Sequence, residues 1–211
     1  MSSTEKEVSY QINNTYSTLN SIGPRTKNIW FVCHGLGYLS RYFIEYFNEL
    51  NPEENYIIAP QAQAKQYLNG KFKHVGASWL TKENTLFEIE NVLNYLDSVY
   101  TKEISNNNIN FIALGFSQGV SVITRWIAKR KIPCSKLILY AGKVPHEFTT
   151  KDFEHIPSVL FIVGDQDEYI SSEIIKNEKK YLDSLFEKQI EYVVFNGKHE
   201  VKRNIITKIL H

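Results

Sequence analysis

Six short segments of the chain are apolar at almost every position, and each is about as long as a β-strand. In order they are Ile29–Cys33, Tyr56–Ala59, Ile109–Leu114, Leu137–Ala141, Val159–Val163 and Tyr192–Phe195. Continuous apolar runs of this length are typical of strands in a parallel sheet, because helices cover both faces of such a sheet. The pattern therefore predicts a mostly parallel sheet that is buried on both sides.

Segments with helical spacing of apolar residues lie between these runs. The inward face of the longest consists of Leu86, Ile89, Leu93, Leu96 and Tyr100. Thr81 is expected to cap the N-terminus of this helix. Further helices are expected after Ser40, after Ser117, after a cap at Ser171 or Ser172, and over Val201–Leu210. The alternation of strands and helices predicts a doubly wound α/β sheet.

The N-terminal region follows a different pattern. Val8–Ile12 alternates apolar and polar residues, Asn13 and Asn14 offer a turn, and Tyr16–Ser21 resembles a second strand. This predicts an antiparallel hairpin at the edge of the sheet. No internal repeat interrupts the chain, and 211 residues fit one domain over residues 1–211.

Charge and composition narrow the classes of partner. The net charge is +1, from 24 Lys and Arg against 23 Asp and Glu, whereas domains that bind nucleic acid usually carry a strong basic excess. The first residues lack the apolar core of a signal peptide, and the apolar runs are far shorter than the ~20 residues of a membrane span. Cys33 and Cys134 are expected as reduced thiols. We therefore expect a cytoplasmic protein with no integral membrane segment and no nucleic-acid partner.

No motif in the sequence indicates a metal or a cofactor. The Cys and His residues do not have the spacing of a zinc site, and no Walker-type phosphate loop is present. Gly35-Leu36-Gly37 is too short for a dinucleotide fingerprint, which needs a third glycine at the start of a helix. The chemistry is therefore expected to come from side chains and backbone amides alone.

The strongest local motif is Gly115-Phe116-Ser117-Gln118-Gly119. It follows the apolar run Ile109–Leu114 and begins a helix, which is the strand–turn–helix context of a nucleophile elbow. Small residues at Gly115 and Gly119 let the strand and helix approach, and the helix N-terminus favours developing negative charge. The pattern predicts Ser117 as a nucleophile.

A serine nucleophile needs a base, and in this fold an acid and then a histidine follow the serine along the chain. His199 alone among the histidines follows the last predicted strand in a short loop before a helix. Two acids, Asp165 and Asp167, follow the strand Val159–Val163. Asp165 is close enough to the strand end for an Asx-type bond to the next amides, so Asp167 is favoured as the acid that orients His199.

A second glycine motif, His34-Gly35-Leu36-Gly37, follows the first inner strand. Such a loop can turn a backbone N–H toward the site, and an oxyanion hole needs one such donor besides the amide after the nucleophile. The expected donors are the backbone amides of Leu36 and Gln118. His34 itself is expected to orient the loop by hydrogen bonding.

The ordered set of these motifs resembles the phospholipase/carboxylesterase family of α/β-hydrolases, which includes acyl-protein thioesterases. The matching pieces are His34-Gly35-Leu36-Gly37, Ala59-Pro60, Ser78-Trp79, Gly115-Phe116-Ser117-Gln118-Gly119, Gly164-Asp165-Gln166-Asp167 and Gly197-Lys198-His199. The resemblance implies an α/β-hydrolase fold, with Asp167 as the triad acid and the Leu36 and Gln118 amides as oxyanion donors. Tyr38 departs from it, because the family usually has an acidic residue there. Lys143–Pro157 is too short for a cap domain.

The segment Gln61–Trp79 is longer than an ordinary strand-to-helix connection of about 2–6 residues. It leaves the predicted sheet at the edge where the candidate catalytic residues gather. Its side chains Tyr67, Phe72 and Trp79 are expected to wall an open substrate site, although they could instead pack onto the core.

The sequence as a whole predicts a serine hydrolase that cleaves carboxylic esters or thioesters of small molecules through an acyl-serine. Two alternatives stay open: a peptidase or amidase on the same triad, and a ligand-binding protein without catalysis. The natural substrate and the oligomeric state do not follow from the sequence.

Overall fold

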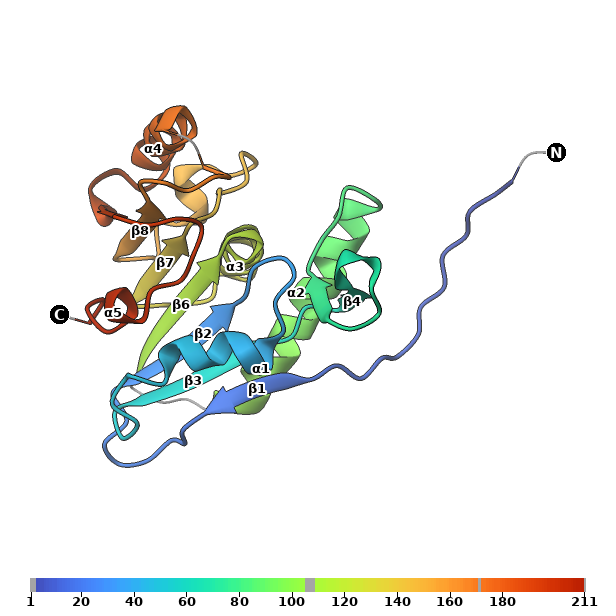
Figure 1. Cartoon of the computed structure of the whole chain (residues 1–211), viewed down its shortest axis with the longest axis horizontal. Coiled ribbons are helices and arrows are strands. Elements are labelled where there is room, and N and C mark those ends of the chain that lie inside the picture. The colour runs from blue at the N-terminus through green and yellow to red at the C-terminus, as the bar shows by residue number, and fades with distance from the viewer. Residues whose placement is uncertain (1–2, 105–108, 171, 211) are drawn as a thin grey trace.

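The computed structural model describes residues 3–104, 109–170 and 172–210, and within these ranges it contains one large sheet of seven strands (Figure 1). The spatial order is β1-β3-β2-β6-β7-β8-β9. The strands are β1 (Tyr16–Leu19), β2 (Asn28–Cys33), β3 (Asn55–Pro60), β6 (Asn110–Phe116), β7 (Lys136–Tyr140), β8 (Val159–Gly164) and β9 (Ile190–Phe195). All neighbours pair in parallel except β1 and β3. The predicted parallel sheet is confirmed.

Helices follow the strands in the predicted alternation. They are α1 (Ser40–Phe43), which continues into the 3-10 helix η1 (Ile44–Phe47), α2 (Thr85–Glu103), α3 (Gln118–Arg130), α4 (Ser172–Phe186) and α5 (Arg203–Ile206). The last helix is shorter than the expected Val201–Leu210. Ser171, one of the two expected caps of α4, lies outside the described residues.

Two neighbouring residues of β2 show that helices cover both faces of the sheet. Successive side chains of a strand point to opposite faces. Phe31 stacks on Trp126 of α3 at 4.6 Å, whereas Trp30 contacts Phe47 of η1 at 5.8 Å between ring centroids. The helices α3 and η1 therefore lie on opposite faces, and the core has one apolar layer on each side of the sheet.

The N-terminal hairpin was predicted with the wrong pairing. The antiparallel edge strand exists as β1, but its partner is β3, with Tyr16 opposite Pro60 and Leu19 opposite Ile57. Val8–Ile12 is not a strand, and Val8, Tyr10 and Ile12 are 80%, 77% and 66% exposed. The sheet edge offers β1 an already buried partner, whereas an isolated two-stranded hairpin is only marginally stable in water.

The start of α2 also differs from the prediction. The helix begins at Thr85, after Asn84 in a left-handed conformation, and Leu86 is 84% exposed. Thr81 belongs to the turn before the helix, where its hydroxyl oxygen accepts the Glu83 N–H at 3.2 Å. The inward face of α2 therefore begins one turn later than predicted, at Ile89.

The long segment after β3 forms a small sheet of its own. β4 (Ala64–Tyr67) and β5 (Val75–Ser78) pair antiparallel, with the 3-10 turn η2 (Leu68–Gly70) between them (Figure 1). The N–H of Gly37 donates to the carbonyl of Ala77 at 2.8 Å. This bond joins the small sheet to the glycine loop after β2.

Candidate active site

Ser117 lies at a sharp turn between β6 and α3. Its backbone angles are φ 54° and ψ −118°, which a residue with a side chain adopts only when its surroundings hold it there. A Cβ on Gly115 would lie 2.4 Å from the Gly119 carbonyl oxygen, and a Cβ on Gly119 would lie 2.1 Å from that of Cys33. Glycine is therefore required at both positions, as the sequence motif predicts.

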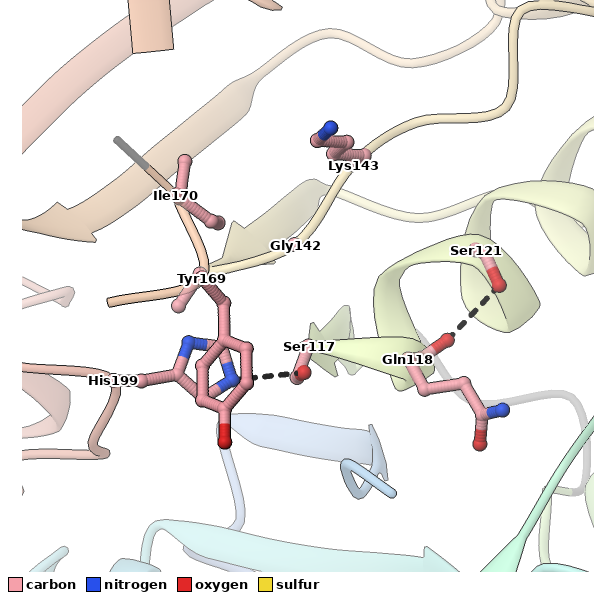
Figure 2. A pocket seen from close by; sticks show the side chains of 9 residues that line it. Ser117, Gln118, Ser121, Gly142, Lys143, Tyr169, Ile170 and His199 are labelled. Carbon is pink, nitrogen blue, oxygen red and sulfur yellow. Dashed lines mark hydrogen bonds between the residues drawn. The ribbon is translucent and has the colours of Figure 1, made fainter. Parts of the chain in front are cut away.

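Three side chains from three loops form one chain of hydrogen bonds. The Ser117 hydroxyl is 2.9 Å from Nε2 of His199 (Figure 2). On the other side of the ring, Nδ1–H of His199 donates to Oδ2 of Asp167 at 2.7 Å. The other carboxylate oxygen of Asp167 accepts the N–H groups of Tyr169 at 2.8 Å and Ile170 at 3.0 Å. The structure thus brings the predicted serine, histidine and acid into contact, with the acid buried and its orientation fixed.

The Asx-type bonds that the sequence suggested for Asp165 are made by the other candidate acid. The Asx-type bonds to following amides are made by Asp167, not by Asp165. Asp165 instead accepts the N–H of Gly197 at 3.1 Å, across to the loop that carries His199. Glu168, which sequence reasoning missed, accepts the backbone N–H of His199 at 3.3 Å. Asp165 and Glu168 therefore hold the loop that carries His199 in place beside Asp167.

Two backbone amides near Ser117 are unpaired: that of Gln118, which follows it, and that of Leu36, whose neighbour Gly35 is so close that a Cβ there would lie 3.1 Å from Cβ of Ser117. Over the ranges that the structure describes, the N–H groups of Leu36 and Gln118 have no hydrogen-bond acceptor, whereas Gly37 and Tyr38 in the same loop donate to Ala77 and Gly35. Gln118 is the first residue of α3, so its N–H is one of those that a helix leaves without a partner. The two amides predicted as oxyanion donors are therefore available to a ligand.

The loop His34–Gly37 is held in place by the side chain of His34, which is fully buried. Burial lowers the pKa of His34 to about 4, so the ring is neutral at pH 7. Its Nε2 accepts the N–H of Ala62 at 3.1 Å, so Nδ1 carries the proton and donates to the Gly35 carbonyl at 2.8 Å. His34 fastens the loop to the residues just after β3, in agreement with the prediction that it orients the loop by hydrogen bonding.

The side chain of Gln118 has a structural role that the sequence did not reveal. Its Oε1 accepts the N–H of Trp79 at 2.9 Å, and its Nε2 donates to the Leu80 carbonyl at 2.7 Å and to the Ser78 hydroxyl at 3.1 Å. The first turn of α3 is thereby fastened to the end of β5 and the two residues after it. These bonds occupy both the oxygen and the nitrogen of the side-chain amide.

A pocket of about 280 Å³ opens beside the Ser117 hydroxyl (Figure 2). Its lining residues are Ser117, Gln118, Ser121, Ala141, Gly142, Lys143, Tyr169, Ile170 and His199. Sequence reasoning missed those after β7 and after Asp167. The location of both segments directly behind strand ends could have indicated them, because ligands of open α/β sheets bind at that edge.

The aromatic residues expected to wall the substrate site are not among those that line this pocket. Tyr67 and Phe72 are 54% and 78% exposed and contact each other, with ring centroids 5.1 Å apart. Their part in substrate binding stays a prediction. Trp79 is only 2% exposed, and its Nε1–H donates to the His34 carbonyl at 2.8 Å. Its side chain stabilises the glycine loop and leaves almost no surface for a substrate.

Comparison with known proteins identifies the family. The sequence model of the phospholipase/carboxylesterase family matches residues 14–211, which is nearly the whole chain. The chain belongs to the phospholipase/carboxylesterase family. This membership makes it a hydrolase of the esterase type and confirms the resemblance of its motifs. A search of curated proteins found no significant match.

Solved structures of several other proteins share the fold. Acyl-protein thioesterase 2 of Zea mays superposes with a TM-score of 0.70 at 15% identity, covering 94% of this chain and 98% of that one. A phospholipase/carboxylesterase of Dyadobacter fermentans gives 0.66 at 17% identity, covering 95% and 98%. A carboxylesterase of Mesorhizobium loti gives 0.68 at 14% identity, covering 88% of each chain. The α/β-hydrolase fold predicted for this member of the family is confirmed.

Two further features of the described residues bear on ligands. None of their helices has the length and apolar character needed to cross a bilayer. No three His, Cys, Asp or Glu side chains within those same ranges are grouped so that they could hold a metal ion.

Proposed function

We propose that this family member is a serine hydrolase that cleaves small carboxylic esters and thioesters through an acyl-Ser117 intermediate. The observation that carries the proposal is the hydrogen-bonded chain from the Ser117 hydroxyl to His199 at 2.9 Å and from His199 to Asp167 at 2.7 Å. It ends at a strained turn beside an open pocket, which is the arrangement of an activated serine nucleophile.

The first half of the reaction forms the acyl-enzyme. Nε2 of His199 takes the hydroxyl proton while Oγ of Ser117 attacks the carbonyl carbon. The carbonyl oxygen becomes an oxyanion and accepts hydrogen bonds from the amides of Leu36 and Gln118. Asp167 stabilises the imidazolium and keeps the proton of Nδ1 pointing toward itself. His199 then gives its new proton to the departing alcohol or thiol.

The second half releases the acid. A water molecule attacks the acyl carbon, and Nε2 of His199 takes one of its protons. The same two amides hold the second oxyanion. When this intermediate collapses, His199 returns the proton to Oγ of Ser117, and the carboxylic acid leaves.

A panel of matched substrates tests the reaction class. An oxygen ester, a thioester and an amide with the same short acyl group are incubated with the purified protein, and acid release is followed. We expect turnover of the ester and the thioester and only background release from the amide. Amide cleavage at a comparable rate would assign a peptidase or amidase, and a lack of all three reactions would favour a binding protein.

The oxyanion donors are tested by variants that separate backbone from side chain. Leu36→Ala keeps the N–H and is expected to stay within about tenfold of wild-type kcat, whereas Leu36→Pro removes it and should lower kcat by roughly 10²–10³. Circular dichroism checks that both variants fold. Equal activity of the two folded variants would contradict a donor at Leu36.

A further inference from the structure

The pocket beside Ser117 has a marked charge asymmetry. Among the residues that line it, Lys143 carries the only permanent charge, and no carboxylate lines it. Lys143 lies in the connection that follows β7, and its side chain is exposed. Figure 2 shows the Lys143 side chain next to Gly142. Ile170 and Ser121 are among the other side chains that line the pocket.

The ammonium group of Lys143 is not paired with an acid. In the part of the chain that the structure describes, no Asp or Glu oxygen lies within 4.0 Å of it. Glu178 interacts with it electrostatically over a longer range. This carboxylate is buried and accepts the N–H of Val144 at 2.8 Å, so it is already held by the backbone. The cation is therefore free to meet a ligand.

A second source of positive potential lies at the bottom of the same pocket. Ser117 and Gln118 stand at the N-terminus of the thirteen-residue helix α3, where the helix dipole favours negative charge. A cation on the rim adds to this field, and a cleft with charges of one sign attracts ligands of the opposite sign. The volume of about 280 Å³ suits a short substituent.

We propose that Lys143 binds an anionic group of the substrate, so that short esters with a carboxylate or sulfonate are preferred over neutral ones. This inference rests on the proposed ester hydrolysis. The charged group could belong to the acyl part or to the alcohol part of the ester. The shared chemistry is an anion that reaches the Lys143 ammonium while the carbonyl carbon lies at Ser117.

Two pairs of substrates distinguish these cases. The acyl pair is the mono-p-nitrophenyl ester of adipic acid and its methyl-capped form. The alcohol pair is 4-(butanoyloxy)benzenesulfonate and the corresponding sulfonamide. For each pair, the ratio of kcat/KM for the anionic and the neutral ester is compared between wild type and variants, because intrinsic reactivity cancels in that comparison.

Lys143→Met is expected to lower this ratio about tenfold in one pair, since a charge-assisted contact to an exposed ammonium lies at the weak end of such bonds. The kcat/KM for the neutral esters should fall much less than that for the anionic esters. Lys143→Arg keeps the charge and should retain the preference. Lys208→Met is the matched control for net charge. Lys208 is exposed and lies two residues beyond the end of α5, and the carbonyl of its neighbour Ile209 accepts a bond from Lys136 at the start of β7, away from the pocket.

Three results would overturn the inference. They are an unchanged ratio in both pairs for Lys143→Met, an equal fall in Lys208→Met, and a loss of preference in Lys143→Arg. In each case, continued hydrolysis of the neutral esters would leave the proposed function standing. Lack of hydrolysis of all four esters by the wild type would instead contradict the proposed function itself.

Discussion

Replacing Ser117 by alanine is expected to lower kcat for an activated ester by about 10⁴–10⁶, the size of effect found when a triad nucleophile is removed. The hydroxyl that lies 2.9 Å from His199 is the only group at the turn that can form the acyl bond in this account. The measurement is the rate of p-nitrophenyl butyrate hydrolysis by purified wild type and variant.

Ser121→Ala is the matched control for this variant. Its hydroxyl lies in the same pocket and donates to the Gln118 carbonyl at 3.0 Å, but it has no contact with His199 (Figure 2). We expect it to keep kcat within about tenfold of wild type, because a single neutral hydrogen bond contributes about 1 kcal/mol. A Ser117→Ala protein that is folded and keeps a tenth of wild-type activity would show that Ser117 is not the nucleophile.

The second large effect is expected at Asp167. Asp167→Asn should lower kcat by about 10³–10⁴, because an asparagine amide beside Nδ1 stabilises the wrong tautomer of the histidine. In that tautomer Nε2 carries a proton and cannot take one from Ser117. The variant keeps an oxygen for the N–H groups of Tyr169 and Ile170, so the loop is expected to stay in place.

Asp165→Asn is the comparison that separates the two acids. Its carboxylate binds the N–H of Gly197, and an asparagine oxygen can accept the same bond. The loss in kcat should therefore be at least about 10²-fold smaller than for Asp167→Asn. The reverse ranking would assign the acid to Asp165 and contradict the hydrogen-bond geometry at His199.

The inner strands and the order of the site residues could be predicted from the sequence because both are local properties. A run such as Val159–Gly164 is apolar throughout because helices cover both of its faces, and Asp167 follows within a few residues. The same holds for the Ser117 turn, where Gly115 and Gly119 mark a close approach of two elements. Short-range patterns thus gave the nucleophile, the base and the acid as candidates.

Pairings between distant segments could not be predicted in this way. The pattern at Tyr16–Leu19 is that of any edge strand. Its partner, β3, becomes available only when the other strands have assembled and left β3 at the edge of the parallel part of the sheet. The β4–β5 pair is joined to the rest of the fold by the bond from the Gly37 N–H to the Ala77 carbonyl, which links two segments far apart in the sequence. The place of Lys143 behind a strand end is a local property, but its relation to Ser117 exists only once β6 and β7 lie side by side.

Covalent labelling tests the central claim most directly. Wild type and Ser117→Ala are incubated with a fluorophosphonate, which reacts with activated serines, and the mass of the intact protein is measured before peptide mapping. The proposed function predicts one adduct per wild-type chain, located at Ser117, and none on the folded variant. An unlabelled wild type, or an adduct that persists in Ser117→Ala, would contradict it.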